Sequence, residues 1–241
     1  TAGDQTVTAT DTTTPALTDT DTVTVSAGAA ATFEVDAPAT ATAGTAFDVT
    51  VTAFDAYTNV ATGYTGTVQL TSGDAQATLP ANYTFTAADA GIHTFTAGVT
   101  LGTAGDQTVT ATDTTTPALT GTDTVTVSAG AATQLRIETA ADDSGSEIGA
   151  ELLVAGDALV AYAITYDAYD NFVENAAATW SLTGITDGVV AGDLVPSADN
   201  KSATLTGNLV GTGTIQAVAG PLSDTTGTIT VVAGAPAEVR I

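Results

Sequence analysis

The sequence predicts an all-β protein made of tandem antiparallel β-sandwiches in a linear array. Three observations support this fold class. Short segments alternate threonine with valine or alanine, as in QTVTATD at 107–113, and this period of two is typical of half-buried strands. Turn signals recur about every 8–12 residues, without a helical period between them. A segment of 30 residues occurs twice, which indicates repeated modules.

The repeat predicts the domain organisation. Residues 1–30 recur as residues 103–132, and the only difference is Asp19 in place of Gly121. The phrase AGAAATFEV at 27–35 recurs in weaker form at 129–137 and 233–241. We therefore expect four segments, in chain order: the C-terminal strands of a preceding module (1–29), a complete module (30–131), a divergent complete module (132–234) and the first strand of a following module (235–241).

The complete module shows strand patterns along its whole length. The predicted strands are FDVTVTAF (47–54), GTVQL (66–70), NYTFTA (82–87), HTFTAGVTL (93–101), QTVTATD (107–113) and DTVTVSA (123–129). About seven such strands in about 100 residues fit an antiparallel sandwich of the immunoglobulin kind. A parallel sheet would need crossover helices, which the pattern lacks.

The second module aligns with the first in outline. FDAYTNVATGYTGTVQL (54–70) matches YDAYDNFVENAAATWSL (166–182), so the second module has about ten extra residues, in the loop 142–151. Trp180 then aligns with Val68, and we expect it on the third strand, facing the core.

The second strand of this module, ALVAYAITY at 158–166, leaves two inward-facing sets open. They are Val160, Tyr162 and Ile164, or Leu159, Ala161 and Ala163. The first set is favoured because it buries more apolar area, although a slip of one residue would reverse the choice.

Composition restricts the classes of function. The chain has 27 acidic residues against 3 basic ones, which gives a net charge of −24. Such a polyanion lacks the Lys/Arg surface that binds nucleic-acid phosphates or anionic lipid. No apolar run reaches the roughly 18 residues that a membrane-spanning helix needs. We expect no nucleic-acid partner and no membrane span in this segment.

Catalytic groups are scarce. The chain contains no cysteine and one histidine, His93, whose aligned residue in the second module is Ala203. A Ser–His or Cys–His pair therefore does not repeat between modules. Acidic pairs are common, but they occur in turns of repeated modules. We expect no enzyme activity, no catalytic residue and no bound organic cofactor.

The series at 42–95 resembles the tandem immunoglobulin-like repeats of large bacterial surface proteins, and is more loosely similar to filamin and invasin modules. DAYTN (55–59), YTGTV (64–68) and YTFTAADAGIHTF (83–95) carry the resemblance. It covers the first module fully and the second in outline. The resemblance implies an extracellular or cell-surface location and a role in a stalk, adhesin or surface layer. It brings no catalytic residues with it.

Loop carboxylates suggest a metal site, because Ca²⁺ binds clustered carboxylate and carbonyl oxygens. In the second module, two turns at one pole of the sandwich hold Asp167, Asp170, Asn171 and Asp224. In the first module, two turns at the opposite pole hold Asp74 and Asp106. The linker 128–133 is expected to bring these poles together. The sequence therefore predicts a calcium site at the module junction, formed by Asp167, Asp170, Asn171 and Asp224 with Asp74 and Asp106.

Two alternatives to this site stay open. Asp and Asn side chains often cap turns by bonding their own backbone, which needs no metal. The loop DDSGSE (142–147) is a second calcium candidate, with Asp142, Asp143 and Glu147.

The expected function is that of a non-enzymatic extracellular structural protein, a rod, stalk or fibre in an adhesin, filament or surface layer. Its partners would be neighbouring modules or subunits joined end to end, either in a longer tandem chain or by strand addition. The alternative is a module that binds a glycan or protein on the cell surface through loops at one pole, with Tyr57 and Tyr169 best placed. The threonine arrays are outward strand residues, O-glycosylation sites or a flat ice-binding face.

Overall fold

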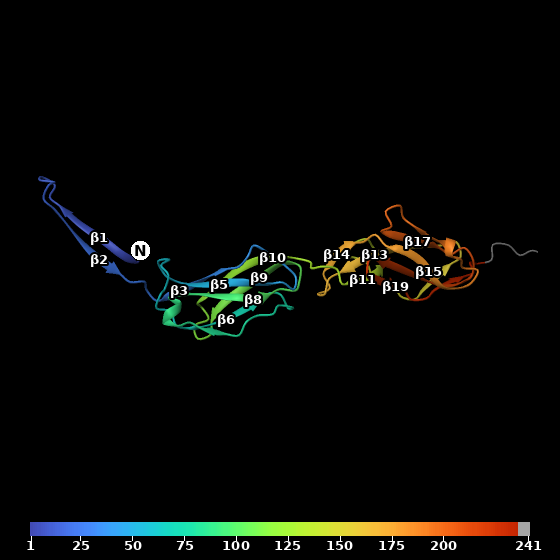
Figure 1. Ribbon diagram of the computed structural model, residues 1–241, viewed down its shortest axis with the longest axis horizontal. Helices are drawn as coiled ribbons and strands as arrows, with labels where there is room; N and C mark the ends of the chain where they lie inside the picture. The colour runs from blue at the N-terminus through green and yellow to red at the C-terminus, as the bar shows by residue number, and fades with distance from the viewer. Residues whose placement is uncertain (236–241) are drawn as a thin grey trace, which may run out of the picture. The chain divides into compact units, whose positions relative to one another are not determined.

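The computed structural model describes residues 1–235 and divides into two compact units, Thr1–Ser128 and Ala129–Ile241. Over the described residues, each unit consists of strands and turns, with one single-turn 3₁₀ helix apiece (Figure 1). Within the described residues, no helix is long and apolar enough to cross a membrane. The strand predicted at 235–241 lies outside the described residues, except for Ala235.

Unit 1 contains a hairpin and a two-sheet sandwich. The hairpin is β1 (Gly3–Thr10) and β2 (Thr18–Val25). One sheet of the sandwich has the order β3-β5-β8, and the other has the order β4-β10-β9-β6-β7. The bounds are β3 (Ala30–Asp36), β4 (Thr40–Thr42), β5 (Ala46–Asp55), β6 (Thr67–Ser72), β7 (Tyr83–Thr84), η1 (Ala87–Asp89), β8 (Ile92–Thr100), β9 (Gly105–Asp113) and β10 (Thr120–Ser128).

Unit 2 is a second two-sheet sandwich. One sheet has the order β11-β13-β17-β16 with β14 paired to β13, and the other has the order β12-β20-β18-β15 with β19 paired to β18. The bounds are β11 (Gln134–Glu138), β12 (Glu151–Val154), β13 (Ala158–Tyr166), β14 (Phe172–Asn175), β15 (Thr179–Asp187), η2 (Ala191–Asp193), β16 (Leu194–Pro196), β17 (Ser202–Thr206), β18 (Gly211–Ala219), β19 (Leu222–Thr225) and β20 (Ile229–Val232).

The strand order in both units is immunoglobulin-like. The long strands pair antiparallel, and the parallel pairs among the described residues are β4–β10 and β12–β20. A short strand that leaves the first sheet to pair parallel with the last strand of the other sheet is consistent with this sandwich family. The predicted fold class of antiparallel immunoglobulin-like β-sandwiches is therefore confirmed.

Five of the six strands predicted in the first module match β5, β6, β8, β9 and β10 to within a few residues. The segment 82–87 differs, because β7 covers only Tyr83–Thr84. The backbone N–H and the hydroxyl of Thr86 both donate to Asp89 Oδ2, at 2.6 and 2.8 Å. This capping arrangement turns the chain into η1 and ends the strand.

His93 belongs to an aromatic cluster in the first sandwich. Its ring stacks on Tyr83 with centroids 3.4 Å apart, and it meets the edge of Phe95 at 4.8 Å. Burial lowers the pKa of His93, although nearby Asp89 opposes that effect. These contacts give the histidine a packing role in the sandwich.

The core of unit 2 corrects one prediction. Ala161 and Ala163 of β13 are fully buried, whereas Val160, from the favoured set, is 39% exposed. Large side chains from other strands fill the space between the sheets, so alanines complete the layer at normal packing density. The apolar area of one strand alone does not decide which of its faces is buried, because the side chains of the opposite sheet also fill the core. Ile164 is buried as well, but on the other face, where its partner is Asn175 of β14.

Trp180 is on β15 and faces the core, as predicted. It is 8% exposed, and its Nε1–H donates to the carbonyl oxygen of Asn200 at 2.8 Å. The aligned Val68 on β6 is fully buried. The two modules thus fill the same inward position with side chains of very different volume, which requires different packing around it.

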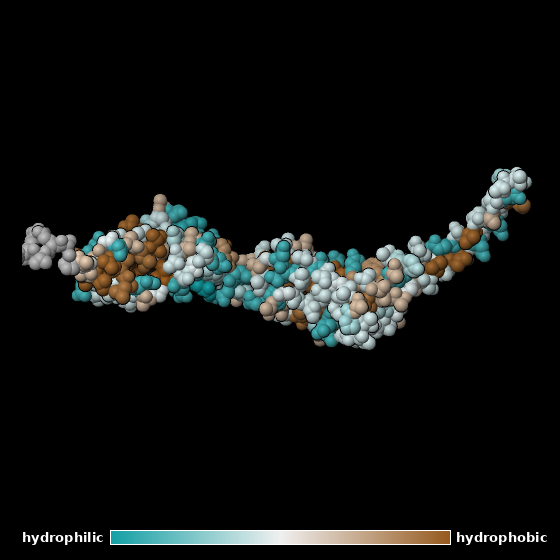
Figure 2. All heavy atoms as spheres, turned by 180° about the vertical axis from the view of Figure 1, so that it is seen from behind, coloured by the Kyte–Doolittle hydropathy of each residue, from teal (hydrophilic) through white to brown (hydrophobic). Residues whose placement is uncertain are grey.

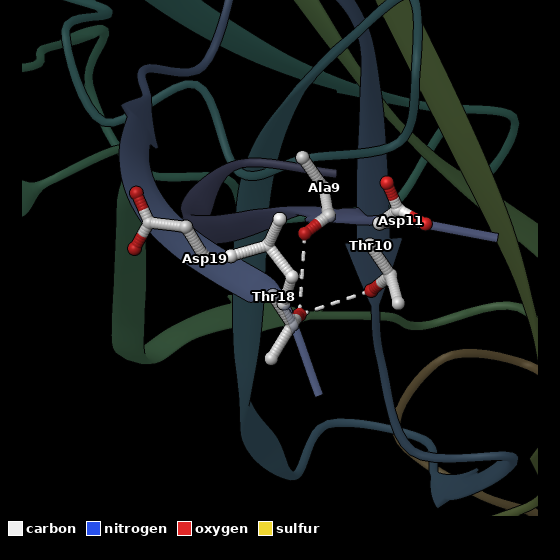
Figure 3. Close-up of a pocket in the computed structure, with 6 residues that line it drawn as sticks. Ala9, Thr10, Asp11, Thr18 and Asp19 are labelled. Carbon is white, nitrogen blue, oxygen red and sulfur yellow. Dashed lines mark hydrogen bonds between the residues drawn. The ribbon is translucent and has the colours of Figure 1, made fainter. Parts of the chain in front are cut away.

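The hairpin β1–β2 reproduces the pair β9–β10 in a different environment. Gly3 pairs with Val25 as Gly105 pairs with Val127, and the registers agree along both pairs. Every residue of β1 and β2 is exposed. A shallow pocket lies beside the turn of the hairpin (Figure 3). There the Thr18 hydroxyl is hydrogen-bonded to the Thr10 hydroxyl and donates to the carbonyl oxygen of Ala9. The hairpin therefore has the local geometry of a sandwich pair without a covering sheet.

Threonine hydroxyls face outward on the sheet that contains β9 and β10. Pairs across neighbouring strands bond each other there, at 2.8–3.1 Å: Thr110–Thr122, Thr112–Thr120 and Thr67–Thr84. Unit 2 has two such pairs at 2.7 Å, Thr183–Thr214 and Thr186–Thr212. Cross-strand hydroxyl pairs stabilise a sheet while leaving its outer face polar.

Unit 2 exposes more apolar surface than the sandwich of unit 1. Figure 2 shows apolar side chains gathered over unit 2. The large apolar side chains exposed there are Leu152, Val154, Val160, Ile185, Val190, Val195, Leu209, Val210 and Val218. In the sandwich of unit 1, Tyr57 and Ile92 are the described residues of this kind. The surface of the divergent module is therefore more apolar than that of the sandwich in unit 1.

The duplicated sequence supplies a matched test of burial. Val109 is fully buried, and Val7, at the same place in the repeat, is 62% exposed. We expect Val109→Ala to lower the free energy of unfolding of unit 1 by about 2 kcal/mol, because it deletes buried methyl groups and leaves a cavity. Val7→Ala should change it by less than about 0.5 kcal/mol. Urea unfolding of both variants checks this, and equal effects would contradict the two environments.

Candidate functional site

The same loop follows the second long strand of each sandwich. Its sequence is Asp-Ala-Tyr-X-Asn, at 55–59 and 167–171. The backbone N–H of Asp55 donates to the carbonyl of Asn59 at 2.9 Å, and that of Asp167 donates to Asn171 at 3.1 Å. The fourth residue of each loop has a positive φ of 63°. Both loops are therefore tight turns of one design.

In unit 1, the loop aspartate binds a residue from outside the loop. Asp55 Oδ2 accepts the backbone N–H of Gly28 at 2.8 Å. Asp55 Oδ1 accepts the N–H groups of Tyr57 and Asn59 at 2.8 and 2.9 Å. The Asn59 side-chain amide donates to both carboxylate oxygens. Gly28 precedes β3, so this carboxylate ties the linker to the sandwich that follows it.

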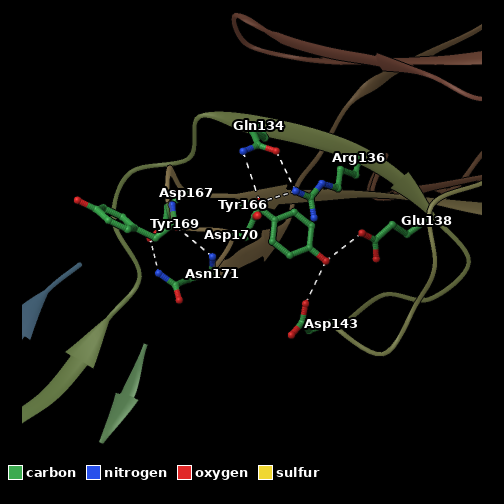
Figure 4. Close-up of polar contacts among 9 residues, drawn as sticks. All are labelled: Gln134, Arg136, Glu138, Asp143, Tyr166, Asp167, Tyr169, Asp170 and Asn171. Carbon is green, nitrogen blue, oxygen red and sulfur yellow. Dashed lines mark hydrogen bonds and ion pairs between the residues drawn. The ribbon is translucent and has the colours of Figure 1, made fainter. Parts of the chain in front are cut away.

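Unit 2 repeats these contacts. Asp167 Oδ2 accepts the N–H of Gly130 at 2.7 Å. Asp167 Oδ1 accepts the N–H groups of Tyr169 and Asn171 at 2.8 and 3.0 Å, and these three residues are drawn in Figure 4. The Asn171 side-chain amide donates to Asp167 Oδ2 at 2.8 Å. We call each set an aspartate clamp: Asp55 with Gly28, Tyr57 and Asn59, and Asp167 with Gly130, Tyr169 and Asn171.

Both clamp carboxylates are buried, with 3% of Asp55 and 1% of Asp167 exposed. The side chain of Asn59, followed by the N–H of Gly28, holds the pKa of Asp55 well below its usual range. At Asp167, burial acts to raise the pKa, but Asn171 and the backbone donors outweigh it and the pKa is lowered. Each carboxylate is therefore ionised at neutral pH and receives charge-assisted hydrogen bonds.

The clamp of unit 1 has one more contact. Asn59 Oδ1 accepts the backbone N–H of Ala2, which precedes β1, at 2.7 Å. The same loop thus accepts hydrogen bonds from both ends of the hairpin segment, from the N–H of Ala2 at its start and from the N–H of Gly28 after its last strand.

The other residues of the predicted calcium set have protein partners within their own units. The carboxylate of Asp74 accepts the N–H groups of Gly102 and Thr103, at 2.6 and 3.0 Å, and the Thr103 hydroxyl. Asp106 accepts the Thr126 hydroxyl at 2.7 Å. Asp74 thus caps turns, which is the alternative left open by the sequence, whereas Asp106 lies on β9 and bonds across to Thr126 on β10.

In unit 2 the set is divided between different contacts. Asp170 forms an ion pair with Arg136. Asp224 is on β19 and accepts the N–H of Ile137 on β11, at 2.7 Å. Among residues 1–235, no three acidic or histidine side chains lie close enough together to hold a metal ion. The calcium site at the module junction stays a prediction.

The two tyrosines of the clamp loops differ in exposure. Tyr57 is 80% exposed, whereas Tyr169 is half-buried. The N–H of each is fixed by its clamp aspartate, so the loop backbone beneath the ring is held in place.

The sequence pointed to Asp167 and Asn171 as site residues and to DAYTN (55–59) as a repeated motif, but not to the partners Gly28 and Gly130. The signal was present, because both the Ala-Gly-Ala phrase and the DAY-X-N loop recur once per module. A pair of motifs that repeat together is a candidate contact, and only the fold shows that the two meet.

Matched substitutions test the clamp of unit 2. We expect Asp167→Asn to lower the free energy of unfolding by about 1–3 kcal/mol, because an amide nitrogen then faces buried N–H donors. Asp170→Asn, three residues on, removes an exposed ion pair and should cost less than about 1 kcal/mol. Amide hydrogen exchange should accelerate at Gly130 in the first variant only. Unchanged protection of Gly130 in Asp167→Asn would contradict the clamp.

Comparison with known proteins gives no family assignment. No protein-family model matches the chain, and no curated protein matches it. Similar solved structures include bacterial adhesin and surface-layer domains, and also a glycosyl hydrolase. One is invasin, a bacterial integrin-binding protein, at 15% identity and a TM-score of 0.41, with 90% of this chain and 43% of invasin covered.

Two further structures are similar at comparable identity. The Escherichia coli adhesin FdeC is 20% identical with a TM-score of 0.40, and the match covers 89% of this chain and 69% of FdeC. Domains 5–6 of the S-layer protein SbsC are 18% identical with a TM-score of 0.28, and the match covers 85% of this chain and 98% of that two-domain structure. This chain thus spans less than half of the invasin structure and about two thirds of the FdeC structure.

Proposed function

We propose that this chain is a non-enzymatic structural segment of an extracellular or cell-surface protein, in which immunoglobulin-like modules join end to end as a rod or stalk. The observation that carries the proposal is the aspartate clamp, present in both units with Gly–Asp bonds of 2.8 and 2.7 Å. Each clamp fixes a linker residue to the module that follows it. A linker residue held in this way leaves less free chain between consecutive modules, which would limit bending there.

The burial of the clamps supports a mechanical role. A buried, ionised carboxylate with several N–H donors is costly to disrupt, because each donor would be left without a partner. Asp55 and Asp167 each accept bonds from the linker and from their own loop. A pull on the linker would therefore act on several bonds at once.

The surface charge also fits a role as a spacer. With 27 acidic residues against 3 basic ones, neighbouring rods would repel each other and stay separate. In the sandwich of unit 1, outward threonine pairs keep the outer face of the sheet polar. Both properties suit a surface that must stay hydrated at high density.

The hairpin extends the proposal to a further module. Its register equals that of β9–β10, but Val7, Val23 and Val25 are 62%, 50% and 41% exposed. In the sandwich the matching face is buried. We infer that β1–β2 is the last strand pair of another module, whose other strands cover these valines. The clamp of Asp55 would then connect that module, through the linker after the hairpin, to the sandwich of unit 1.

Spin-label distances test whether the clamp stiffens the linker. The chain contains no cysteine, so Gln69→Cys in unit 1 and Ser181→Cys in unit 2, both exposed, introduce single labelling sites. We expect a narrow distance distribution that broadens in Asp167→Asn and stays narrow in Asp170→Asn. A distribution that is as broad in the native clamp as in Asp167→Asn would refute a stiff rod.

A second candidate function is glycan binding by the clamp loop of unit 1. Tyr57 favours it, since this ring is 80% exposed on a loop whose backbone is fixed by Asp55. Sugars stack on rigid exposed aromatic rings. We expect saturable binding to at least one immobilised surface glycan, lost in Tyr57→Ala and kept in Ile92→Ala. Binding to no glycan on a broad panel would leave the structural role alone.

A further inference from the structure

One buried carboxylate in unit 2 lacks the partners that the clamp aspartates have. Glu138, the last residue of β11, is 4% exposed. Its Oε2 is buried and has no hydrogen-bond partner among residues 1–235. Burying a carboxylate oxygen without a donor or a cation is strongly unfavourable, so this atom calls for an explanation.

The other oxygen of Glu138 shares a hydroxyl with a second acid. Tyr166 Oη lies 2.9 Å from Glu138 Oε1 and 3.1 Å from Asp143 Oδ1 (Figure 4). A tyrosine hydroxyl has one proton, so it cannot serve two ionised carboxylates with full hydrogen bonds. Two carboxyl groups are therefore held close together with too few donors between them.

The nearby guanidinium does not resolve this shortage. Arg136 lies over the Tyr166 ring, with its Cζ 4.3 Å from the centroid. Its hydrogen bonds go to Asp170 and Gln134. Burial raises the pKa of Glu138, and the charges of Asp143 and Glu147 add to that, against the opposing effects of Tyr166 and Arg136.

The loop that faces Glu138 is acidic and open to solvent. A Cβ built on Gly145 would lie 3.0 Å from Glu138 Oε2, so this oxygen points at the loop. Asp143 and Glu147 in the loop are exposed, and Glu147 pairs with Glu138 through a backbone bridge. Asp142 is already used, since it accepts the backbone N–H and the hydroxyl of Ser144. The loop overlaps the insertion at 142–151 that distinguishes the second module from the first.

We propose that this loop, residues 139–147, binds a Ca²⁺ ion through Glu138 Oε2 and the Asp143 carboxylate. Three carboxylates do not converge here, so the remaining ligands would be loop carbonyl oxygens and water, which Ca²⁺ accepts readily. The ion would supply the missing partner of Oε2 and offset the repulsion among Glu138, Asp143 and Glu147. It would also fix the loop to β11. The site lies wholly within unit 2 and does not depend on the proposed rod.

Calorimetric titration of the full chain with Ca²⁺ tests the site. We expect a saturable site whose affinity falls about tenfold or more in Glu138→Gln and in Asp143→Asn, because each loses a charged ligand. Glu151→Gln, which changes an exposed acid outside the loop at the start of β12, is the matched control and should bind like the native chain. Ca²⁺ should raise the melting temperature of the native chain and of this control.

The two substitutions are chosen so that a loss of Ca²⁺ binding can be distinguished from a loss of folding. Glu138→Gln preserves the shape of the buried side chain, and Asp143→Asn changes an exposed residue, so at least one variant stays folded. The proposal is overturned if all four proteins bind Ca²⁺ equally, or if none shows saturable binding. It is also overturned if binding survives in Glu138→Gln and Asp143→Asn but is lost in Asp74→Asn.

Discussion

Buried aspartate carboxylates that accept backbone N–H groups are the interaction on which the loops of both sandwiches depend. A β-sandwich satisfies the N–H groups of its strands within its sheets, but the turns at its ends leave donors without partners. Asp55, Asp74, Asp113 and Asp167 lie at such turns and are 1–5% exposed. Each accepts at least two backbone N–H groups. A chain with few cations can bury these acids because backbone donors take the place of lysine and arginine.

This constraint also explains how a strongly acidic protein remains folded. Within residues 1–235, Asp170 forms an ion pair with Arg136, and Asp89 lies 3.8 Å from His93, which is charged only when protonated. The buried acids instead have hydrogen bonds that hold the pKa of Asp55, Asp113 and Asp167 low, even where burial opposes that effect. Glu138 is the exception, since its oxygens meet one hydroxyl and no backbone N–H. The divergent module therefore has a site whose charge is not balanced by the protein alone.

The duplicated segment shows how much of a strand pair is local. In β1–β2 and β9–β10 the same residues form the same register and the same threonine pairs. Asp11 and Asp113 cap the same Thr-Thr turn, but only Asp113 also accepts the hydroxyl of Tyr64. The environments also differ at the one position where the sequences differ. A Cβ at Gly121 would lie 2.2 Å from the carbonyl oxygen of Phe33, so the sandwich has no room for a side chain there, whereas Asp19 in the hairpin is exposed.

The sequence by itself determined the all-β class, most strands of the first module and the inward position of Trp180, because alternation and turn residues are local properties. It could also identify the clamp aspartates as loop residues of one repeated motif. Tertiary structure decided what these residues contact: Gly28 and Gly130 meet Asp55 and Asp167 across long stretches of sequence. It likewise decided which face of β13 is buried, since Ala161 and Ala163 fit only the space that the opposite sheet leaves. Glu138 was missed for the same reason. Its burial depends on Tyr166 and on an inserted loop, and the partners of a buried charge are set by packing, which local sequence does not encode.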